Sequence, residues 1–289
     1  MKKEVHNFIN KVINIVLGLC ILVIIWLVAQ IFIFTSFKIP SDSMEPSLTT
    51  GDNILAWKPF IGPRIFNIFA SMRNEQTKIY RIPGFKKIKR NDILVFNFPH
   101  PNNWDKIEMH ILKYYIKRCV GLPGDTLSIQ NGYFHVEKVN IPLGNLNSQK
   151  RIALTEKFEN GIFYSFPFDS IINWNIKKFG PLYIPCEGDS ITLNRTNFPI
   201  YKKLIEWEQQ GALEYKDSTS FLNGKSINGY RFQKNYYFMA GDNGLNSQDS
   251  RYWGLLPEEY IVGKAWIIWK SIDPYTNKFR WERFLKVIH

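Results

Sequence analysis

The chain is organised around one short polar stretch that follows a long apolar segment, Pro40-Ser41-Asp42-Ser43-Met44-Glu45-Pro46-Ser47-Leu48. The two prolines exclude a regular helix here, because proline lacks a backbone donor and restricts the residue before it. Ser41 and Ser43 are therefore expected on an extended or turning backbone with exposed hydroxyl groups. On its own the stretch is equally compatible with an ordinary linker rich in serine and proline, so its role depends on the rest of the chain.

An uncharged apolar run precedes this turn, since no charged residue occurs between Lys11 and Lys38. The hydrocarbon layer of a membrane, ~30 Å thick, needs about 20 apolar helical residues to span it. We therefore predict a transmembrane helix at 12–36 after a tail at 1–11. The alternative is a cleaved signal peptide, but the run exceeds its usual apolar length of roughly 7–15 residues. Lysines in the tail favour a cytoplasmic amino terminus, with the remaining chain across the membrane.

The composition is that of a folded protein with a basic surface. The chain has 289 residues, 45% of them hydrophobic, which suffices for one large or two modest domains. Its net charge of +12 suits a phospholipid surface or nucleic acid, and charge alone does not choose between them. The five histidines lack metal-ligand spacing and the three cysteines form no CxxC pair, so neither a metal nor another cofactor is expected. Whether Cys119 and Cys186 pair stays open.

A turn that leads into a short strand recurs along the chain and predicts a mainly β fold. Such turns begin at Gly51, Gly124 and Gly188, each followed by an aspartate. Further strands are expected at 92–98 and 114–120, and a short helix is expected around 201–210.

The segment between Trp57 and Arg90 mixes apolar and basic residues. Its apolar members are Phe60, Ile61, Ile65, Phe66, Ile68 and Phe69, flanked by Lys58, Arg64 and Arg73. A hairpin packed in the core explains this pattern as well as contact with lipid headgroups does.

Side chains alternate along a strand, so Lys117 should face the same way as Tyr115 and Cys119, and it is the one charged side chain on that face. Lysines in this context are commonly edge charges that reach for water. If the site is apolar instead, the amine loses its proton more readily and becomes a general base for a serine hydroxyl. Ser43 is distant in the sequence, so only the fold can bring the two together.

A polar loop at 241–254 follows a strand-like stretch. Turn chemistry accounts for its glycines and asparagines, but not for the grouping of Ser247, Asp249, Ser250 and Arg251. Such a group can supply the hydrogen bonds and the ion pair that hold a catalytic lysine in place.

Taken in order, these motifs resemble those of the bacterial type I signal peptidases of the S26 family. The resemblance rests on the serine turn, the Gly51 strand, Tyr115-Ile116-Lys117-Arg118 with Gly121-Leu122-Pro123-Gly124-Asp125, and Gly241-Asp242-Asn243 through Gly263-Lys264-Ala265. It covers about 37–129 and 236–266, and the intervening residues match only loosely.

The resemblance implies a membrane-anchored serine endopeptidase that cleaves signal peptides from secretory preproteins outside the cytoplasmic membrane. Its partners would be those preproteins and the phospholipid membrane, with no nucleic acid. The catalytic β domain would comprise 37–130 and 233–289, interrupted by an inserted β-rich subdomain at 131–232.

The resemblance also implies roles for individual residues. Ser43 would be the nucleophile and Lys117 the general base, with the Ser41 hydroxyl and the Ser43 N–H forming the oxyanion hole. Ser247 would hold Lys117. The supporting charges would be Asp242, Asp249, Arg118 and Arg251, and the shallow substrate pockets would be lined by Phe37, Ile39, Pro40, Met44, Tyr115 and Ile116.

The chain departs from the family pattern at three positions. Gly244 and Leu245 replace two charged residues of Gly-Asp-Asn-Arg-Asp-Asn-Ser, and Tyr114 replaces a common aspartate. Two alternatives remain: another Ser/Lys hydrolase of similar fold, such as a self-cleaving repressor, and a non-catalytic anchored binding module.

Overall fold

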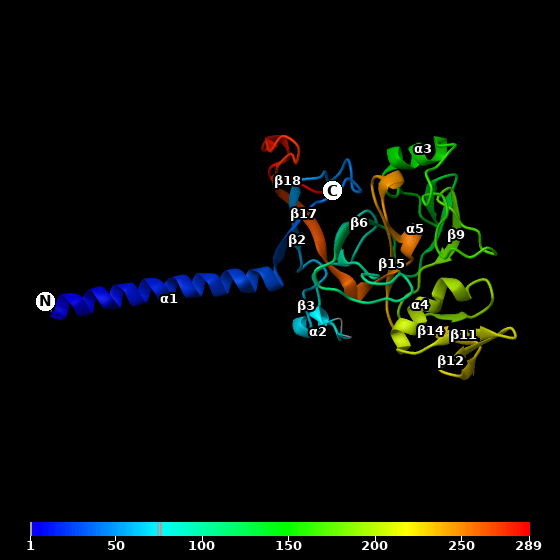
Figure 1. Cartoon of the computed structure of the whole chain (residues 1–289), viewed down its shortest axis with the longest axis horizontal. Helices are drawn as coiled ribbons and strands as arrows, with labels where there is room; N and C mark the ends of the chain where they lie inside the picture. Colours follow the sequence, from blue (N-terminus) through cyan, green and yellow to red (C-terminus); the bar gives the residue numbers. More distant parts are fainter. Residues whose placement is uncertain (1, 74, 76) are drawn as a thin grey trace.

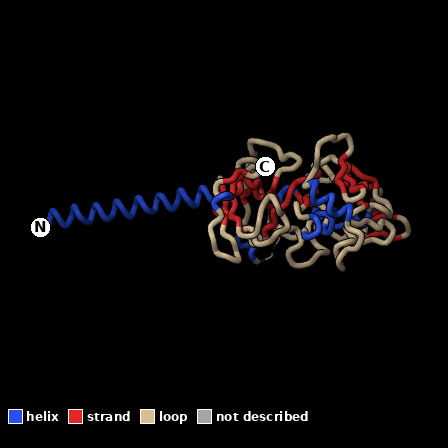
Figure 2. Tube along the Cα trace, turned by 90° about the horizontal axis from the view of Figure 1, so that it is seen from above, coloured by secondary structure: helices blue, strands red, loops and turns tan. Residues whose placement is uncertain are grey.

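A computed structural model describes residues 2–73, 75 and 77–289 of the chain. One long helix, α1 (Lys2–Phe32), projects from a body of strands and loops (Figures 1 and 2). Its stretch His6–Phe32 is long and apolar enough to cross a membrane. The mainly β fold with one amino-terminal apolar helix is thus confirmed.

The helix ends at Phe32, so the predicted end at residue 36 is wrong. The next residues form β1 (Phe34–Lys38), which pairs with β2 (Asp52–Trp57). Lys58 follows β2, and its Nζ donates to the carbonyls of Gln30 and Ile31 at 2.7 and 3.0 Å. A cation that satisfies the last carbonyls stabilises a helix end, which explains why α1 stops here.

The main sheet has eight strands, all paired antiparallel, in the order β1-β2-β17-β5-β6-β15-β16, with β18 also pairing with β17. Besides β1 and β2 it comprises β5 (Ile93–Asn97), β6 (Tyr114–Gly121), β15 (Tyr236–Ala240), β16 (Leu256–Pro257), β17 (Ile261–Ser271) and β18 (Lys286–Val287). The expected strands at 92–98 and 114–120 are therefore present.

Two apolar clusters cover the two faces of this sheet. All of β5 is buried, and its side chains alternate between the clusters as the pleat requires. Ile93 and Val95 belong to the cluster that also holds Met44, whereas Leu94 and Phe96 belong to the larger one. The serine turn is consequently fixed to one face of the sheet by its own methionine.

Residues 126–231 add smaller sheets and two helices on the side of the body away from α1 (Figure 1). The sheets are β8 (Tyr133–Val136) with β7 (Thr126–Gln130) and β9 (Lys178–Tyr183), β10 (Ser190–Thr192) with β14 (Gly229–Arg231), and β11 (Leu213–Lys216) with β12 (Thr219–Leu222) and β13 (Lys225–Ile227); the helices are α3 (Leu146–Leu154) and α4 (Phe198–Gln209). The helix α4 confirms the one expected near 201–210.

The predicted boundary at 130 does not follow the sheets. It falls between β7 and β8, which pair with each other from Leu127 opposite Val136 to Gln130 opposite Tyr133. The larger apolar cluster also runs through both parts of the chain, from Leu94 to Ile205. The division into a catalytic domain at 37–130 plus 233–289 and a subdomain at 131–232 therefore stays a prediction. Both parts contribute side chains to the larger apolar cluster.

The mixed segment at 57–90 divides between core and surface. Phe60 and Ile61 are buried in the larger cluster, whereas Ile65, Ile68 and Phe69 are exposed. The exposed residues lie on or beside the short helix α2 (Ile68–Met72) and the pair β3 (Arg64–Ile65) and β4 (Tyr80–Arg81). Phe60 and Ile61 are thus core residues, and contact of the exposed residues with lipid headgroups stays a prediction.

The remaining elements are short: α5 (Ser250–Trp253), η1 (Gly244–Asn246), η2 (Glu258–Tyr260) and η3 (Trp281–Arg283). The cysteines are all free, so Cys119 and Cys186 do not pair. No group of three or more His, Cys, Asp or Glu side chains among the described residues is placed to hold a metal ion.

Candidate active site

Ser43 and Lys117 meet, although 74 residues separate them in the sequence. Lys117 lies in the middle of β6, and its Nζ donates to Ser43 Oγ at 2.7 Å. The lysine is only 4% exposed, whereas Ser43 is half-buried at the surface turn. Ser41 is exposed, and its Oγ donates to Ser43 Oγ at 3.4 Å. A nucleophile within reach of a buried amine is the geometry that activation by a neutral lysine requires.

The surroundings of Lys117 favour its neutral form. Burial lowers the pKa of Lys117 from its ordinary value of 10.5 to about 8. The Asp249 carboxylate opposes this shift, the Arg251 guanidinium adds to it, and Asp242 and Asp42 oppose it more weakly. The alternative of an edge lysine reaching for water is wrong, because β5 and β15 pair with β6 on its two sides.

Two ion pairs stabilise the polar loop that follows β15. Arg118 donates through Nε and Nη2 to the two carboxylate oxygens of Asp242, each at 2.7 Å. Arg251 donates in the same two-pronged way to Asp249 at 2.8 Å, and both of these side chains are at most 1% exposed. Asp249 also accepts from the Gly241 N–H. The four supporting residues expected from the sequence therefore come together around the site as two buried pairs.

Ser247 does not make the contact expected of it. It is buried beside the Asp249 carboxylate, whose pKa it helps to lower, and it makes no hydrogen bond to Lys117 in the described part of the chain. A Cβ placed on Gly241 would lie 2.0 Å from Ser247 Oγ, so the hydroxyl packs against that glycine. Lys117 Nζ is instead directed at Ser43.

Asp42 links the serine turn to the polar loop, a role that the sequence did not reveal. Its carboxylate accepts from Asn246 Nδ2 at 2.9 Å and from Asn243 Nδ2 at 3.3 Å. The backbone N–H of Asn243 donates to the Ser43 carbonyl at 3.0 Å. These bonds hold the two sides of the site together, and the only hint in the sequence is that both segments are rich in short polar side chains.

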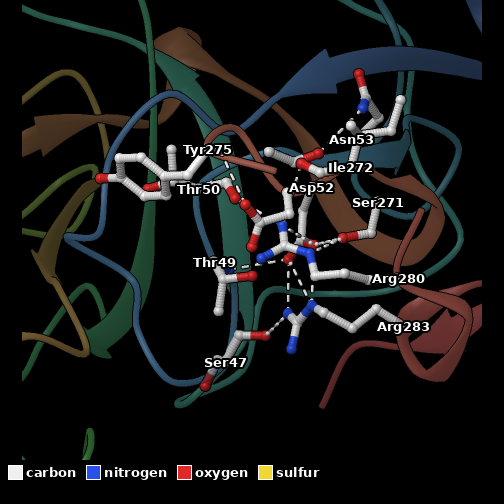
Figure 3. Close-up of polar contacts among 12 residues, drawn as sticks. Ser47, Thr49, Thr50, Asp52, Asn53, Ser271, Ile272, Tyr275, Arg280 and Arg283 are labelled. Carbon is white, nitrogen blue, oxygen red and sulfur yellow. Dashed lines mark hydrogen bonds and ion pairs between the residues drawn. The ribbon is translucent and has the colours of Figure 1, made fainter. Parts of the chain in front are cut away.

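The far side of the turn is fixed by the carboxyl-terminal segment (Figure 3). Asp52 is fully buried at the start of β2, and Arg283 donates to it at 2.6 Å. Arg283 also donates to the Ser47 carbonyl at 3.1 Å. Ser47 in turn donates to Asp242 at 2.5 Å, so this network continues into the pair with Arg118. Sequence analysis did not identify Asp52, Ser47 or Arg283 as part of the site.

Four of the six predicted pocket residues share one apolar cluster. Ile39 and Met44 are buried in it, and Phe37 and Ile116 pack half-buried against it. Pro40 is exposed at the start of the turn. The half-buried pair marks where this cluster meets solvent beside Ser43.

Tyr115 lies apart from that cluster. It packs against the larger cluster, with its ring stacked 4.3 Å from that of Phe98. Its hydroxyl donates to Gln248 Oε1 at 2.9 Å. Successive residues of a strand point to opposite faces, so Tyr115 and Ile116 lie on different faces of β6. The Tyr115 ring centre is 5.4 Å from Lys117 Nζ, so Tyr115 borders the candidate dyad, and a pocket lined by both residues stays a prediction.

Comparison with known proteins supplies the family. The sequence profile described as "Signal peptidase, peptidase S26" matches residues 12–270. The chain belongs to this signal peptidase family. It is 33% identical over 261 residues to Signal peptidase I of Buchnera aphidicola subsp. Schizaphis graminum, covering 86% of this chain and 72% of that protein. Signal peptidase I of Pseudomonas aeruginosa is 30% identical, with 85% and 68% covered.

A crystal structure of a signal peptidase I from Enterococcus faecalis V583 is also similar to the chain. It has 22% sequence identity and a TM-score of 0.30, covering 63% of this chain and 98% of that one. Membership of the signal peptidase family makes the chain a peptidase, and the sequence-based resemblance is confirmed.

Proposed function

We propose that the chain is a membrane-anchored serine endopeptidase that cleaves signal peptides from secretory preproteins after small residues. The observation that carries the proposal is the 2.7 Å contact between Lys117 Nζ and Ser43 Oγ at a buried lysine. Membership of the signal peptidase family supports the substrate class.

The reaction begins with the neutral form of Lys117. Its amine takes the hydroxyl proton of Ser43 while Oγ bonds to the carbonyl carbon of the peptide to be cut. The same ammonium then returns the proton to the departing amine as the C–N bond breaks, which leaves an ester on Ser43. A water molecule, deprotonated by Lys117, attacks this ester and releases the acid product and free serine.

The negative oxygen that develops on the carbonyl needs donors. The Ser41 hydroxyl, exposed and 3.4 Å from Ser43 Oγ, and the Ser43 N–H are the groups we assign to it. A single donor of this kind contributes roughly 3–4 kcal/mol in other serine proteases.

The anchor brings the enzyme to its substrates. The apolar stretch His6–Phe32 would cross the cytoplasmic membrane, and lysines before it favour a cytoplasmic amino terminus. The body would then lie on the outer side, on the same surface where signal peptides emerge. The basic charge suits the phospholipid surface, and no nucleic acid is required.

Cleavage of a preprotein by the full chain in proteoliposomes tests this proposal. Ser43→Ala should lower kcat by at least a factor of about 10³ without loss of preprotein binding, because only the reacting oxygen is removed. Ser226→Ala, an exposed serine in β13, is the matched control and should cleave normally. If Ser43→Ala keeps a tenth of the wild-type rate, the assignment is wrong. Saturable binding without turnover by the wild type would favour the binding-module alternative.

A further inference from the structure

The helix α3, in the loosely matching part of the chain, packs directly against the polar loop of the site. Ser148 and Ile152 lie on its buried face. A Cβ placed on Gly244 would lie 2.7 Å from Ile152 Cδ1 and 2.9 Å from Ser148 Oγ. A larger residue at this position would therefore require the Ile152 or Ser148 side chain to shift, so glycine lets α3 pack closely against the loop.

Leu245, the next residue that departs from the family pattern, also packs against α3. It packs against a small apolar cluster formed by Ile152, Ile176 and Tyr252. The two residues that replace charges in the family pattern thus form the surface on which α3 sits.

Hydrogen bonds join α3 to the loop as well. The Gly244 N–H donates to Ser148 Oγ at 2.6 Å, and both groups are buried. Arg151, one turn along on the exposed side, donates through Nη2 to Asn243 Oδ1 at 3.1 Å. The Gly244 carbonyl accepts from Arg251 at 2.9 Å. The short helix η1 is therefore held between α3 and the buried ion pair.

These contacts continue to the nucleophile. The Asn243 N–H donates to the Ser43 carbonyl, and the Asn243 and Asn246 side chains hold Asp42. Helix α3 is itself fixed, because Gln149 accepts from the Phe134 N–H and donates to the Leu143 carbonyl. A displacement of α3 is thereby passed to the serine turn through η1.

We propose that α3 positions the catalytic serine and that Ser148 is the positioning residue at its centre. This inference rests on the proposed function. Without the Ser148 hydroxyl, the buried Gly244 N–H loses its acceptor and η1 must move to find water. A misplacement of about 1 Å from a remote change can cost up to roughly a hundredfold in rate.

The test measures kcat, KM and the pH profile of kcat for the full chain in proteoliposomes, using a preprotein as substrate. Ser148→Ala should lower kcat at least tenfold with little change in KM. The acidic limb should move to higher pH, because a displaced loop admits water to Lys117 and so raises its pKa. In the intact site Lys117 is buried, and its charged neighbours are Asp249, Arg251, Asp242 and Asp42. Ser165→Ala is the matched control, since Ser165 is equally buried and its hydroxyl has no partner among the described residues.

Unchanged kcat and an unchanged acidic limb in Ser148→Ala would overturn the inference and leave the proposed function standing. A lower melting temperature with no movement of the limb would also overturn it, because the role would then be structural only. If Ser148→Ala does not fold, Arg151→Ala provides the test, because Arg151 is exposed and its loss should not unfold the chain. A fall in kcat at constant KM in this variant supports the inference, and wild-type kcat overturns it. A wild-type chain that does not cleave would overturn both proposals.

Discussion

In the proposed mechanism, burial makes Lys117 a usable base, and the carboxylates around it limit how far its pKa falls. A lysine free in water would be almost wholly protonated at neutral pH, and its ammonium cannot accept a proton from Ser43. Desolvation lowers its pKa to about 8, and the Arg251 charge acts in the same direction. A substantial fraction of the enzyme then carries the neutral amine at mildly alkaline pH, so the base is available without a histidine.

We therefore expect the rate to rise with pH through about 8. Only the deprotonated amine is active, so kcat/KM should fall about tenfold for each pH unit well below the pKa of Lys117. The measurement is kcat/KM of the full chain from pH 6 to 11, with a substrate that has no titrating group near the cut. A profile that rises only above pH 10 would show that burial does not shift this lysine.

Removing one partner of the Arg251 and Asp249 pair should be strongly destabilising, because it leaves the other charge buried without a counter-ion. Burial alone would raise the pKa of Asp249, but the charge of Arg251 and its hydrogen bonds hold that pKa below its ordinary value. Arg251→Met leaves the carboxylate buried and unpaired, which should cost roughly 3–5 kcal/mol of unfolding free energy. Urea unfolding of the detergent-solubilised chain measures this loss.

The matched control is another pair with the same spacing at the surface. Arg73 and Glu75 are bridged at 2.6 Å but are largely exposed, so Arg73→Met should leave the urea midpoint almost unchanged. Equal urea midpoints for Arg251→Met and Arg73→Met would show that removing the arginine costs no more in the buried pair than in the exposed one, and would contradict this prediction.

Helices and strands could be predicted from the sequence where neighbouring residues alone determine them. The turn at Gly51 and the apolar run of β5 each indicated a strand, because glycine starts the turn and buried side chains fill the strand. The helix α3 was missed because its sequence is largely polar, although Asn145 caps it through its side chain. That cap was the signal that could have found it.

The site was predicted less completely, because its contacts are not local. The order of the motifs singled out Ser43 and Lys117, which the structure brings into contact. The contacts of Asp42 and Arg283 depend on partners far along the chain. The pocket implied by the resemblance stays a prediction, and a resemblance of motifs does not show that Tyr115 and Ile116 pack against different clusters.

The edge where β1 and β6 approach Ser43 should set the size of the residue accepted before the cut. Phe37 and Ile116 are half-buried there, and extra methylenes forced into a packed site cost about 1–3 kcal/mol. Peptides with leucine in place of alanine should therefore lose at least about tenfold in kcat/KM. Ile116→Ala should recover part of this loss.

The control for Ile116→Ala is Ile191→Ala, a half-buried isoleucine in β10. It should leave the ratio of kcat/KM for the alanine and leucine peptides unchanged. Equal rates for the two peptides with the wild-type chain would refute a size limit at this edge.

Considered as a whole, the molecule has one end suited to the membrane. The exposed apolar residues near β3, β4 and α2 lie on the side of the body from which α1 projects (Figure 1). Among them Phe69 is 74% exposed and Phe85 is 81% exposed. Lys86 and Lys87 are exposed beside them. Aromatic side chains next to cations are typical of segments that enter the boundary of anionic lipid headgroups.

This surface should bind lipid even without the transmembrane helix. A chain that begins at Ile33, which keeps β1 whole, should sediment with anionic vesicles at low salt. Replacing two large exposed aromatic side chains removes about 1.5 kcal/mol or more of burial for each one, so Phe69→Ser with Phe85→Ser should weaken vesicle binding at least tenfold. The control is Tyr164→Ser with Phe168→Ser, two aromatic residues that are 61% and 59% exposed, and it should change nothing.

The carboxyl-terminal segment offers a competing contact, because Trp281 in η3 is also 74% exposed. Trp281→Ser in the same truncated chain separates the two surfaces. Weaker binding only in the Phe69 and Phe85 variant assigns the contact to the α2 region, whereas weaker binding only in Trp281→Ser assigns it to η3. Complete recovery of the unsubstituted truncated chain in the supernatant would contradict both, and would mean that α1 alone holds the site near the membrane.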